Sequence, residues 1–511
     1  MGLRFKEIPG LKLYCICLAV GLFTGLIDVP YHFLIQKSSV IREHILTSNS
    51  NWHEHLLLIL AIWCIFLVVS RIIKSFPLVG GGGITQTRAI VYGRIVYKNS
   101  AIQLIAKFIS GTIAIGTGLS LGKEGASIQM GSYIGDIASK TTGTKAADRN
   151  HIIAAGAGAG LAAAFSAPLS ASIFIIESIE RFEKAKTTIA VLLASIVAGL
   201  MSYISFSINN FTIITATQPR LSVLESAAVY ISFAIFISLF GKCYHWTLIS
   251  LKRQYPKIKM PVSIKLLSVA CITYLFCIFA VEITGGGQNY LLAEATNGDV
   301  SLSGIVTMLT LHFLFTAISF SLGFPGGIFL PMLVTGGLAG KIFAILLIQL
   351  GISDPSCIGY FVLIGMSSFF IAIVRTPVTA MVLITEITGQ FDILLATVII
   401  GTLTYFITHF FNMTPFYTIL YSDFINQTEY KQQGRISIHL TVMAGSYFDG
   451  KRVNEISLPN NCEIIAAYRF DGILDPKGNY RLKDGDQLEI ELDAADVEKL
   501  HEPLNGLATV Y

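Results

Sequence analysis

A charged pair flanked by glycines interrupts an otherwise apolar part of the chain, at Gly122-Lys123-Glu124-Gly125-Ala126. Apolar residues with scattered glycines precede this pair from residue 108 and follow it to residue 135. Lys123 and Glu124 therefore fall where buried protein or lipid hydrocarbon is expected. An acid at membrane depth is energetically costly and is by default a functional residue. A carboxylate in that position could take the place of an anion and leave it again on protonation, so we expect Glu124 to link anion and proton binding.

Glycine-rich helix starts elsewhere in the chain could bind an anion through backbone amides. In the second half, Gly326-Gly327-Ile328-Phe329-Leu330-Pro331 begins a helix, and its glycines would let amides approach an ion while Phe329 shields it. Each helix start offers unpaired amides and about half a positive charge. The run Gly80-Gly81-Gly82-Gly83-Ile84-Thr85 has two interpretations. It is either a flexible surface loop or a loop whose amides face a ligand at the start of the next helix.

The chain carries an internal repeat. Gly122, Gly131 and Gly135 recur at a constant offset as Gly327, Gly336 and Gly340, and the segment Pro168 to Glu177 recurs as Pro377 to Glu386 with the same spacing. Paired segments interrupted by Gly and Pro in the two halves of a transporter indicate a binding site near the membrane midplane. Glu177 and Glu386 stand at equivalent helix ends, where we expect them to cap helices or pair with basic residues.

Composition places the chain among integral membrane proteins. Of 511 residues, 53% are hydrophobic and 13% charged, with a mean hydropathy of +0.66, which excludes the soluble globular classes. The 45 glycines lie mostly in apolar segments, a pattern that favours closely packed or broken helices over a β-barrel. Helical spans, some of them partial, are predicted at residues 11–27, 56–74, 101–120, 126–139, 151–180, 187–207, 225–250, 263–283, 303–322, 328–350, 359–388 and 392–411, with a polar surface stretch at 36–55.

The C-terminal part differs from the rest in charge and pattern. Residues 434–511 carry 8 Lys and Arg against 13 Asp and Glu, whereas the first 433 residues carry 28 against 19, the basic excess typical of cytoplasmic loops. Alternating apolar residues predict strands from residue 435, at 464–470 and at 482–492, and a helix follows at 494–504. We therefore predict a transmembrane domain at 1–425, a linker at 426–434 and a small α+β cytosolic domain at 435–511.

The motifs together resemble the signature set of the CLC family of chloride channels and chloride/proton antiporters, over residues 10 to 425. The resemblance implies a homodimer with one anion pathway per subunit, inverted repeats and many tilted helices. It implies that Glu124 is the gating and proton-coupling residue and that Lys107 lies near the pathway. The anion-binding residues that it implies are Gly82, Gly83, Ile84, Lys123, Gly125, Gly327, Ile328, Phe329 and Tyr417.

Three motifs depart from the family pattern, at four positions. Gly82 and Thr85 replace a serine and a proline, which weakens any inference about anion selectivity, and Ala126 replaces a proline. Ser178 occupies the position at which proton-coupled members often carry an internal glutamate. Since a serine cannot store a proton at physiological pH, coupled transport would need water or another acid such as Glu180.

The C-terminal domain is similar to the TrkA-C subdomain of regulators of K⁺ conductance, on its overall pattern and on Leu482-Lys-Asp-Gly-Asp-Gln-Leu488. Such domains dimerise and often bind small ligands, including cyclic dinucleotides. The similarity implies cytosolic regulation of the transporter. The alternative is a folded spacer that supports dimerisation.

These observations favour a bacterial plasma-membrane transporter that exchanges chloride, or a related monovalent anion, for protons through Glu124. A passive, voltage- or pH-gated chloride channel is the alternative that Ser178 favours, and a fluoride/proton antiporter fits less well because Phe329 and Tyr417 follow the chloride-type pattern. An enzyme is not expected, because the ten histidines form no cluster with a nucleophile or metal ligands. A membrane receptor that only senses a ligand would not explain the duplicated broken helices. No cofactor, metal or nucleic-acid partner is expected.

Overall fold

The computed structural model describes residues 10–48, 52–92, 94–95, 97–144, 146–179, 185–206, 214–296, 301–427, 435–459, 462–469, 472–474, 480–493, 500, 504 and 506–508. The chain divides into two compact units. The first, here called the helical unit, comprises residues 12–88 and 99–421. The second, here called the C-terminal unit, contains residues 422–511 together with 1–11 and 89–98.

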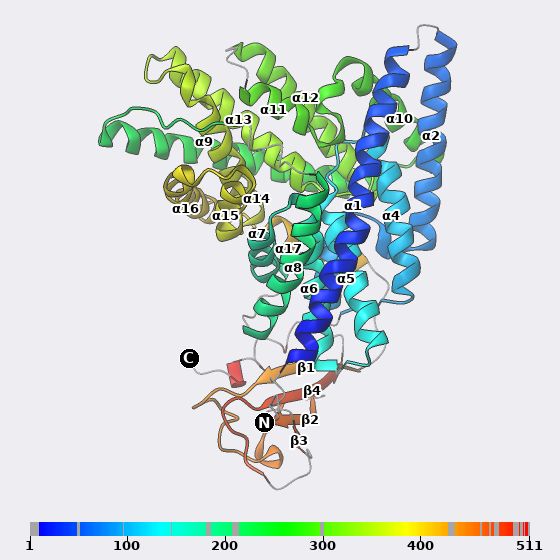
Figure 1. Cartoon of the computed structure of the whole chain (residues 1–511), viewed down its shortest axis with the longest axis vertical. Helices are drawn as coiled ribbons and strands as arrows, with labels where there is room; N and C mark the ends of the chain where they lie inside the picture. Colours follow the sequence, from blue (N-terminus) through cyan, green and yellow to red (C-terminus); the bar gives the residue numbers. More distant parts are fainter. Residues whose placement is uncertain are drawn as a thin grey trace, which may run out of the picture. The chain divides into compact units, whose positions relative to one another are not determined.

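The helical unit contains long helices and several short ones (Figure 1). The helices are α1 (Leu11–Ser48), α2 (Trp52–Ser75), α3 (Ile84–Val91), α4 (Ser100–Gly116), α5 (Glu124–Thr141), α6 (Ala146–Phe165), α7 (Pro168–Phe174), α8 (Ala185–Phe206), α9 (Val223–Gln254), α10 (Val262–Phe279), α11 (Gln288–Thr296), α12 (Leu302–Ser321), α13 (Phe329–Gln349), α14 (Ile358–Val374), α15 (Pro377–Thr388), α16 (Leu394–Phe410) and α17 (Phe416–Gln427).

Within the described residues, nine helices are long and apolar enough to cross a membrane. Their burial differs widely. The apolar window that contains α14 is 100% buried in the protein and that of α13 is 83% buried, whereas only 11% of the α2 window is buried. These fractions place α13 and α14 in the interior of the helical unit and α2 at its surface.

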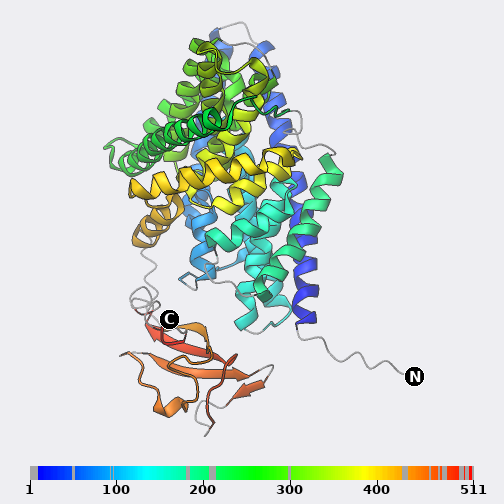
Figure 2. The ribbon, with the colours of Figure 1, turned by 90° about the vertical axis from the view of Figure 1, so that its left-hand side faces the viewer.

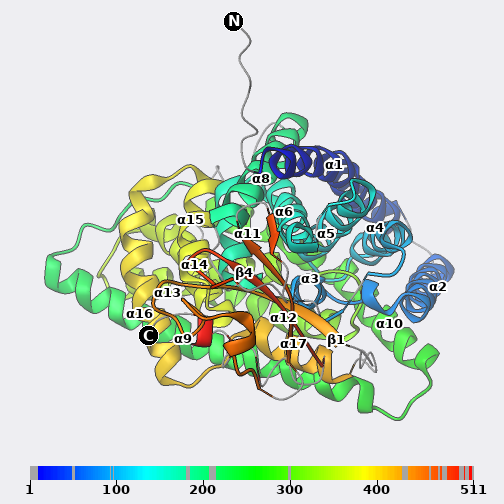
Figure 3. The same cartoon turned by 90° about the horizontal axis from the view of Figure 1, so that it is seen from below.

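Glycines allow two equivalent helix pairs to pack closely. A Cβ on Gly131 of α5 would lie 1.9 Å from the carbonyl oxygen of Gly156 in α6, and one on Gly156 would lie 2.1 Å from the oxygen of Gly131. In the second half, Gly336 of α13 and Gly365 of α14 contact each other in the same way, at 2.5 and 2.4 Å. Small residues of this kind let helix backbones touch within a membrane. The predicted repeat is therefore present in the packing, and α5 and α6 lie side by side in Figures 1 and 3.

Broken helices lie where the sequence predicts them. In the segment 151–180, α6 ends at Phe165, α7 begins at Pro168, and a π-helical turn follows at Ile175–Ile179. In 359–388, α14 ends at Val374 and α15 begins at Pro377. Both prolines stand in the first turn of their helix, where the missing amide is not needed.

Two parts of the span prediction are wrong. Residues 36–48 were not predicted to be helical, yet they continue α1. One of their polar groups has partners on other segments: the Arg42 guanidinium donates to the Gly116 carbonyl at 3.1 Å and to Thr284 Oγ1 at 2.9 Å. The short helices α11 and α17 were not predicted, since each is too short to give a clear apolar period.

The C-terminal unit contains an antiparallel sheet with strand order β1-β4-β2-β3, drawn in orange and red in Figure 2. The strands are β1 (Arg435–Thr441), β2 (Glu463–Arg469), β3 (Gly472–Leu474) and β4 (Gln487–Asp493). Leu440, Leu488, Ile490 and Leu492 belong to its buried apolar cluster. The small α+β domain expected here is confirmed.

The last strand begins later than predicted. Residues 482–486 form a turn, with Gly485 at a φ of +85°, and the strand starts at Gln487. The turn is tied to the end of the first strand, since Val442 N donates to the Asp486 carbonyl at 2.8 Å and Gly485 N to the Val442 carbonyl at 2.9 Å. Most of the linker at 426–434 and of the helix at 494–504 lies outside the described residues.

Candidate functional site

A short backbone bridge joins the two repeat motifs. Gly122 N donates to the Gly327 carbonyl at 2.7 Å, and Gly327 N donates to the Gly122 carbonyl at 2.7 Å. The two glycines are equivalent positions of the repeat, so the contact is reciprocal. It places the start of α5 beside the start of α13, which is the arrangement that two converging helix N-termini require.

Glu124 is the first residue of α5 and its side chain is fully buried. The Glu124 carboxylate fills the space next to Gly122. A Cβ atom built on Gly122 would lie 2.2 Å from Glu124 Oε2 and 3.3 Å from the Leu330 amide nitrogen, so the carboxylate and this amide are close together. The carboxylate is thus turned toward the first turn of α13. Neither of its oxygens reaches hydrogen-bonding geometry with a partner. Because helix starts attract negative charge, the side chain occupies a position that suits an anion.

Aromatic rings surround the start of α13. Phe329 is fully buried and its ring lies 5.2 Å from that of Phe165, 5.5 Å from Phe174 and 4.5 Å from Phe370, between ring centroids. The Tyr417 ring approaches Phe174 at 6.3 Å, and the Tyr417 hydroxyl is buried without a hydrogen-bond partner. An unpartnered buried hydroxyl is rare and calls for an explanation, such as a bound ion or water.

The glycine loop before α3 is fixed in place. Lys107 is fully buried and its Nζ donates to the carbonyls of Val79 at 2.9 Å and Gly81 at 2.7 Å. Gly81 N donates to the Gly323 carbonyl at 2.8 Å, and Gly326 N donates to the Gly81 carbonyl at 3.3 Å. The interpretation of residues 80–85 as a flexible surface loop is therefore wrong. Lys107 therefore holds the backbone of this loop, and the loop lies beside the segment that leads into α13.

The same loop reaches the charged motif. A Cβ on Gly125 would lie 2.2 Å from the carbonyl oxygen of Gly82. Gly83 has a φ of +93°, and a Cβ there would lie 2.5 Å from the carbonyl oxygen of Gly125. Glycine is needed at both Gly83 and Gly125 because no side chain fits the contact. The structure thus brings residues 82–84, 122–125, 327–329 and Lys107 into one region, as the sequence motifs anticipate.

Lys123 points to a partner that sequence reasoning missed. Its Nζ lies 2.6 Å from Nδ1 of His32 on α1. One helical turn before His32 stands Asp28, which is 2% exposed and interacts electrostatically with Lys123. The predicted span at residues 11–27 ends one residue before Asp28, whereas α1 continues to Ser48 and places this isolated acid inside the helix. An acid inside an apolar span is by default a functional candidate.

Glu177 and Glu386 cap each other's helices. Glu177 accepts hydrogen bonds at the start of α15 from Thr379 N at 2.8 Å, Thr379 Oγ1 at 2.5 Å and Val378 N at 3.2 Å. Glu386 accepts the equivalent bonds at the start of α7, from Ser170 N at 2.8 Å, Ser170 Oγ at 2.5 Å and Leu169 N at 3.0 Å. The expected capping role is confirmed, and the caps cross between the two halves.

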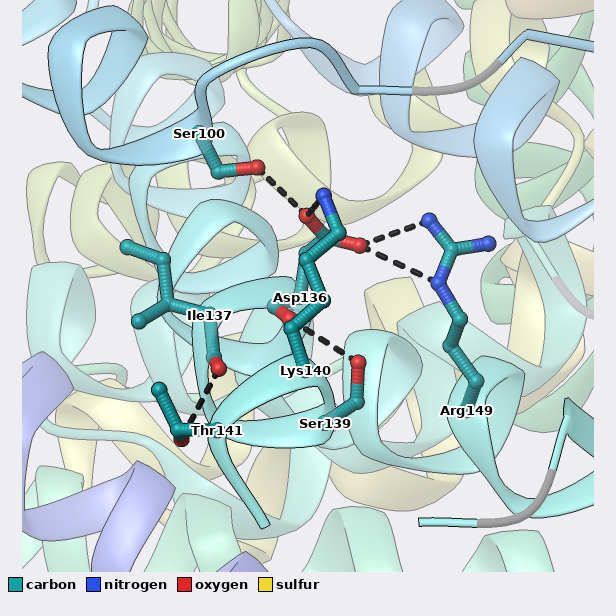
Figure 4. A network of polar contacts seen from close by, with 7 residues as sticks. All are labelled: Ser100, Asp136, Ile137, Ser139, Lys140, Thr141 and Arg149. Carbon is teal, nitrogen blue, oxygen red and sulfur yellow. Dashed lines mark hydrogen bonds and ion pairs between the residues drawn. The ribbon is translucent and has the colours of Figure 1, made fainter. Parts of the chain in front are cut away.

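A buried acid ties three helices together near the end of α5 (Figure 4). Asp136 accepts from Arg149 Nε at 3.1 Å and Nη2 at 2.6 Å, forms an ion pair with Lys140 at 2.6 Å and accepts from the Ser100 hydroxyl. Ser100 begins α4 and Arg149 belongs to α6. Both carboxylate oxygens are satisfied, so we assign Asp136 the structural role of fixing α5.

Ser178 lies in the π-helical turn at Ile175–Ile179 and is 8% exposed. No carboxylate is thus present at this position, and Glu180 lies outside the described residues. Within the described part of the chain, no three His, Cys, Asp or Glu side chains are grouped so that they could hold a metal ion.

Comparisons with known proteins match both units. A family model described as voltage gated chloride channel matches residues 64–409, and a TrkA-C domain model matches residues 439–505. The H(+)/Cl(-) exchange transporter ClcA of Vibrio vulnificus strains YJ016 and CMCP6 is 28% identical over 441 residues, which covers 81% of this chain and 90% of that protein.

Solved structures share the fold. A slow cyanobacterial Cl⁻/H⁺ antiporter superposes with a TM-score of 0.74 at 23% identity, over 82% of this chain and 99% of that one. A CLC-type fluoride/proton antiporter superposes with a TM-score of 0.64 at 20% identity, over 78% and 95%. The expected polytopic fold with an internal repeat and broken helices is therefore confirmed, and the chain is a multi-pass membrane protein.

Proposed function

Because the chain belongs to the voltage-gated chloride channel family, we propose that it exchanges chloride, or a related monovalent anion, for protons across a membrane, with Glu124 as the gating and proton-carrying residue. The observation that carries the proposal is the position of the Glu124 carboxylate, buried and turned toward the start of α13. The similarity to a bacterial H⁺/Cl⁻ exchange transporter supports it.

In the proposed mechanism, the ionised Glu124 carboxylate and an anion compete for the same helix start. Backbone amides at Ile328 and Phe329 and the Tyr417 hydroxyl bind the anion, while the loop at Gly82, Gly83 and Ile84 and the backbone at Gly125 and Gly327 shape its surroundings. When Glu124 takes up a proton, its charge is removed and an anion can replace it. Deprotonation returns the carboxylate to the helix start and displaces the anion. The proton and the anion move in opposite directions when they reach Glu124 from opposite sides of the membrane.

The basic residues have separate proposed roles. Lys107 holds the carbonyls of the glycine loop, so we assign it a positioning role near the pathway. Lys123 supplies a positive charge beside Glu124, and its Nζ is held by His32. Neither needs to contact the anion for the mechanism to work.

A passive chloride channel is the second candidate, and Ser178 is the observation that favours it. A serine at that position stores no proton, so an uncoupled pathway would need no further acid. Fluoride is a less favoured substrate, because Phe329 and Tyr417 follow the chloride-type pattern. Anion competition in the flux measurement described below orders chloride, nitrate and fluoride.

We further propose a homodimer in the bacterial plasma membrane, with a transmembrane domain at 1–425, a linker at 426–434 and a cytoplasmic regulatory domain at 435–511. The division of the chain near residue 421 and the TrkA-C match at 439–505 support these boundaries. The regulatory domain would bind a small ligand such as a cyclic dinucleotide. Titration of the purified protein with cyclic dinucleotides, read as a change in chloride flux, tests this part.

The decisive experiment uses the purified protein in liposomes. A chloride gradient is imposed while a potassium ionophore sets the voltage so that passive proton leak runs the other way, and pH is recorded. We expect uphill proton movement that Glu124→Gln abolishes and that Glu43→Gln, an exposed carboxylate of α1, leaves unchanged. Chloride flux without uphill proton movement in the unmodified protein would establish the channel instead.

A further inference from the structure

We propose that Asp28 of α1 is a second proton-carrying residue of the exchange, and that it passes protons to and from Glu124. The inference rests on the proposed function. It concerns a residue of the first helix, outside every motif that led to the proposal. It would supply the acid that the position of Ser178 lacks.

Asp28 is buried, its carboxylate interacts with the Ser127 hydroxyl and the Lys123 ammonium, and one of its oxygens is left without a partner. It is 2% exposed, and its Oδ1 atom makes no hydrogen bond. Asp136 shows the contrast, because both of its oxygens are bonded to basic side chains or a hydroxyl. Leaving a buried carboxylate oxygen unpartnered is costly, so such a group is expected to hold a proton or a water during function.

Within the part of the chain that the structure describes, the titratable groups around Asp28 come from its own helix and from the start of α5. The ammonium of Lys123 and the carboxylate of Glu124 interact with it from α5, and Tyr31 and His32 belong to its own helix. Two carboxylates therefore share one ammonium, while His32 Nδ1 contacts the Lys123 Nζ. With one proton on either carboxylate the cluster is neutral, so the proton can sit on Asp28 or Glu124 without adding a net charge to the buried site.

Several buried hydroxyls belong to the two helices that carry the acids. The hydroxyls of Thr24 and Tyr31 are buried and, like Oδ1 of Asp28 and both oxygens of Glu124, have no partner in hydrogen-bonding geometry. The Ser127 hydroxyl interacts with the Asp28 carboxylate. Ser127 follows Glu124 by one turn of α5 and lies beside the Asp28 carboxylate. Buried hydroxyls of this kind are sites for bridging water. A water or the Ser127 hydroxyl would thus relay the proton.

The transfer is balanced without any other reactant. The O–H bond of protonated Glu124 breaks, an O–H bond forms on the Asp28 carboxylate, and the electron pair left on Glu124 makes it an anion again. Asp28 then releases its proton to water. In the reverse direction Asp28 protonates Glu124, and Glu124 gives up the helix start to an anion.

The test compares variants in the liposome measurement. Asp28→Asn should lower uphill proton movement at least about a hundredfold, the lower end of the range expected for losing a proton-transfer group, while chloride flux stays within about twofold. Asp28→Ser should have the same effect as Asp28→Asn, and it replaces the asparagine variant in the test if that variant does not fold. Asp28→Glu should retain proton movement, and Glu43→Gln is the matched control on the same helix.

Three outcomes of the liposome measurement would overturn the proposed role of Asp28. Unchanged proton movement in a folded Asp28→Asn or Asp28→Ser protein, with Glu124→Gln inactive in proton movement, would overturn this inference and leave the proposed function intact. Equal loss of chloride and proton fluxes in both folded variants would make Asp28 a structural residue and would also overturn it. Absence of uphill proton movement in the unmodified protein would overturn both proposals together.

Discussion

At the scale of single residues, close packing in this protein depends on glycines, which have no Cβ atom. Gly125, Gly131 and Gly156 each stand where an added Cβ would lie within 2.2 Å of a carbonyl oxygen on another segment. These contacts are with backbone, which cannot swing aside. The close approach of the motif to the loop at Gly82, and of α5 to α6, is therefore possible only with glycine.

Gly131→Ala should destabilise the protein by about 1–3 kcal/mol or more, because the new methyl group forces α5 and α6 apart. The measurement is thermal unfolding in detergent. Gly304→Ala is the control, since Gly304 is an exposed residue of α12 and a Cβ there meets nothing nearer than the Ser301 hydroxyl at 3.6 Å. An equal melting temperature for both variants would show that the α5–α6 contact can relax.

Lys107→Met should reduce anion flux and stability together. Two buried carbonyls, of Val79 and Gly81, would lose their donor, at about 1–3 kcal/mol for each unsatisfied group. Lys74→Met, which removes an exposed lysine at the end of α2, should change neither. Normal stability with reduced flux would instead mean that the charge of Lys107 acts on the anion directly.

At the scale of elements, the two short helices α7 and α15 hold each other. A glutamate near the end of each helix accepts hydrogen bonds from two backbone amides and one hydroxyl at the start of the other helix. A carboxylate at a helix start is favoured by both the free amides and the helix dipole. The pairing fixes where these helices begin without any basic residue. Arg375, just before α15, lies instead over the ring of Tyr405 at 5.5 Å.

Glu177→Ala and Glu386→Ala should each destabilise the protein by about 1–2 kcal/mol, as expected for the loss of a helix cap. Because the contacts are equivalent, each variant is the control for the other. Thermal unfolding of both variants, and of the double variant, measures the effect. A large loss for one and none for the other would show that the two caps are not equivalent in the membrane.

At the scale of the whole molecule, the C-terminal unit has its own core and its own buried ion pair. Asp486 is 1% exposed and accepts from Arg469 Nε at 2.8 Å and Nη2 at 2.7 Å and from Lys483 N at 2.8 Å. The hydrogen bond with Asp486 raises the pKa of Arg469, which therefore stays charged at physiological pH. This pair fixes the turn that precedes β4.

Arg469→Met should destabilise the C-terminal unit by about 2 kcal/mol, less than for a fully buried pair because the arginine is 27% exposed. Limited proteolysis of the full-length protein should then cut after residue 434 at lower protease concentration. Lys451→Met, a substitution elsewhere in the C-terminal unit, is the control for this measurement. Unchanged chloride flux in the Arg469 variant would mean that the unit is not required for basal transport.

Sequence reasoning located the motif residues but not their contacts. Glu124, Phe329 and Gly327 stand out because polar residues and glycines interrupt apolar runs, and the structure brings them together as expected. The crossing caps of Glu177 and Glu386 could not be foreseen, because each partner is about 200 positions away and a helix end gives no sign of which carboxylate it will meet. Asp28 was overlooked because it directly follows the predicted span at residues 11–27, and because its contacts with Lys123 and Glu124 join residues far apart in the sequence.

The crossing caps also bear on how such a chain can arise and be divided. One half by itself would lack the carboxylate that completes its own helix start, and a second copy related by a two-fold axis would provide it. The duplicated chain is in this sense a dimer whose two partners have been joined by a peptide link. Two fragments separated between α8 and α9 should therefore assemble when they are produced together, and neither should persist alone.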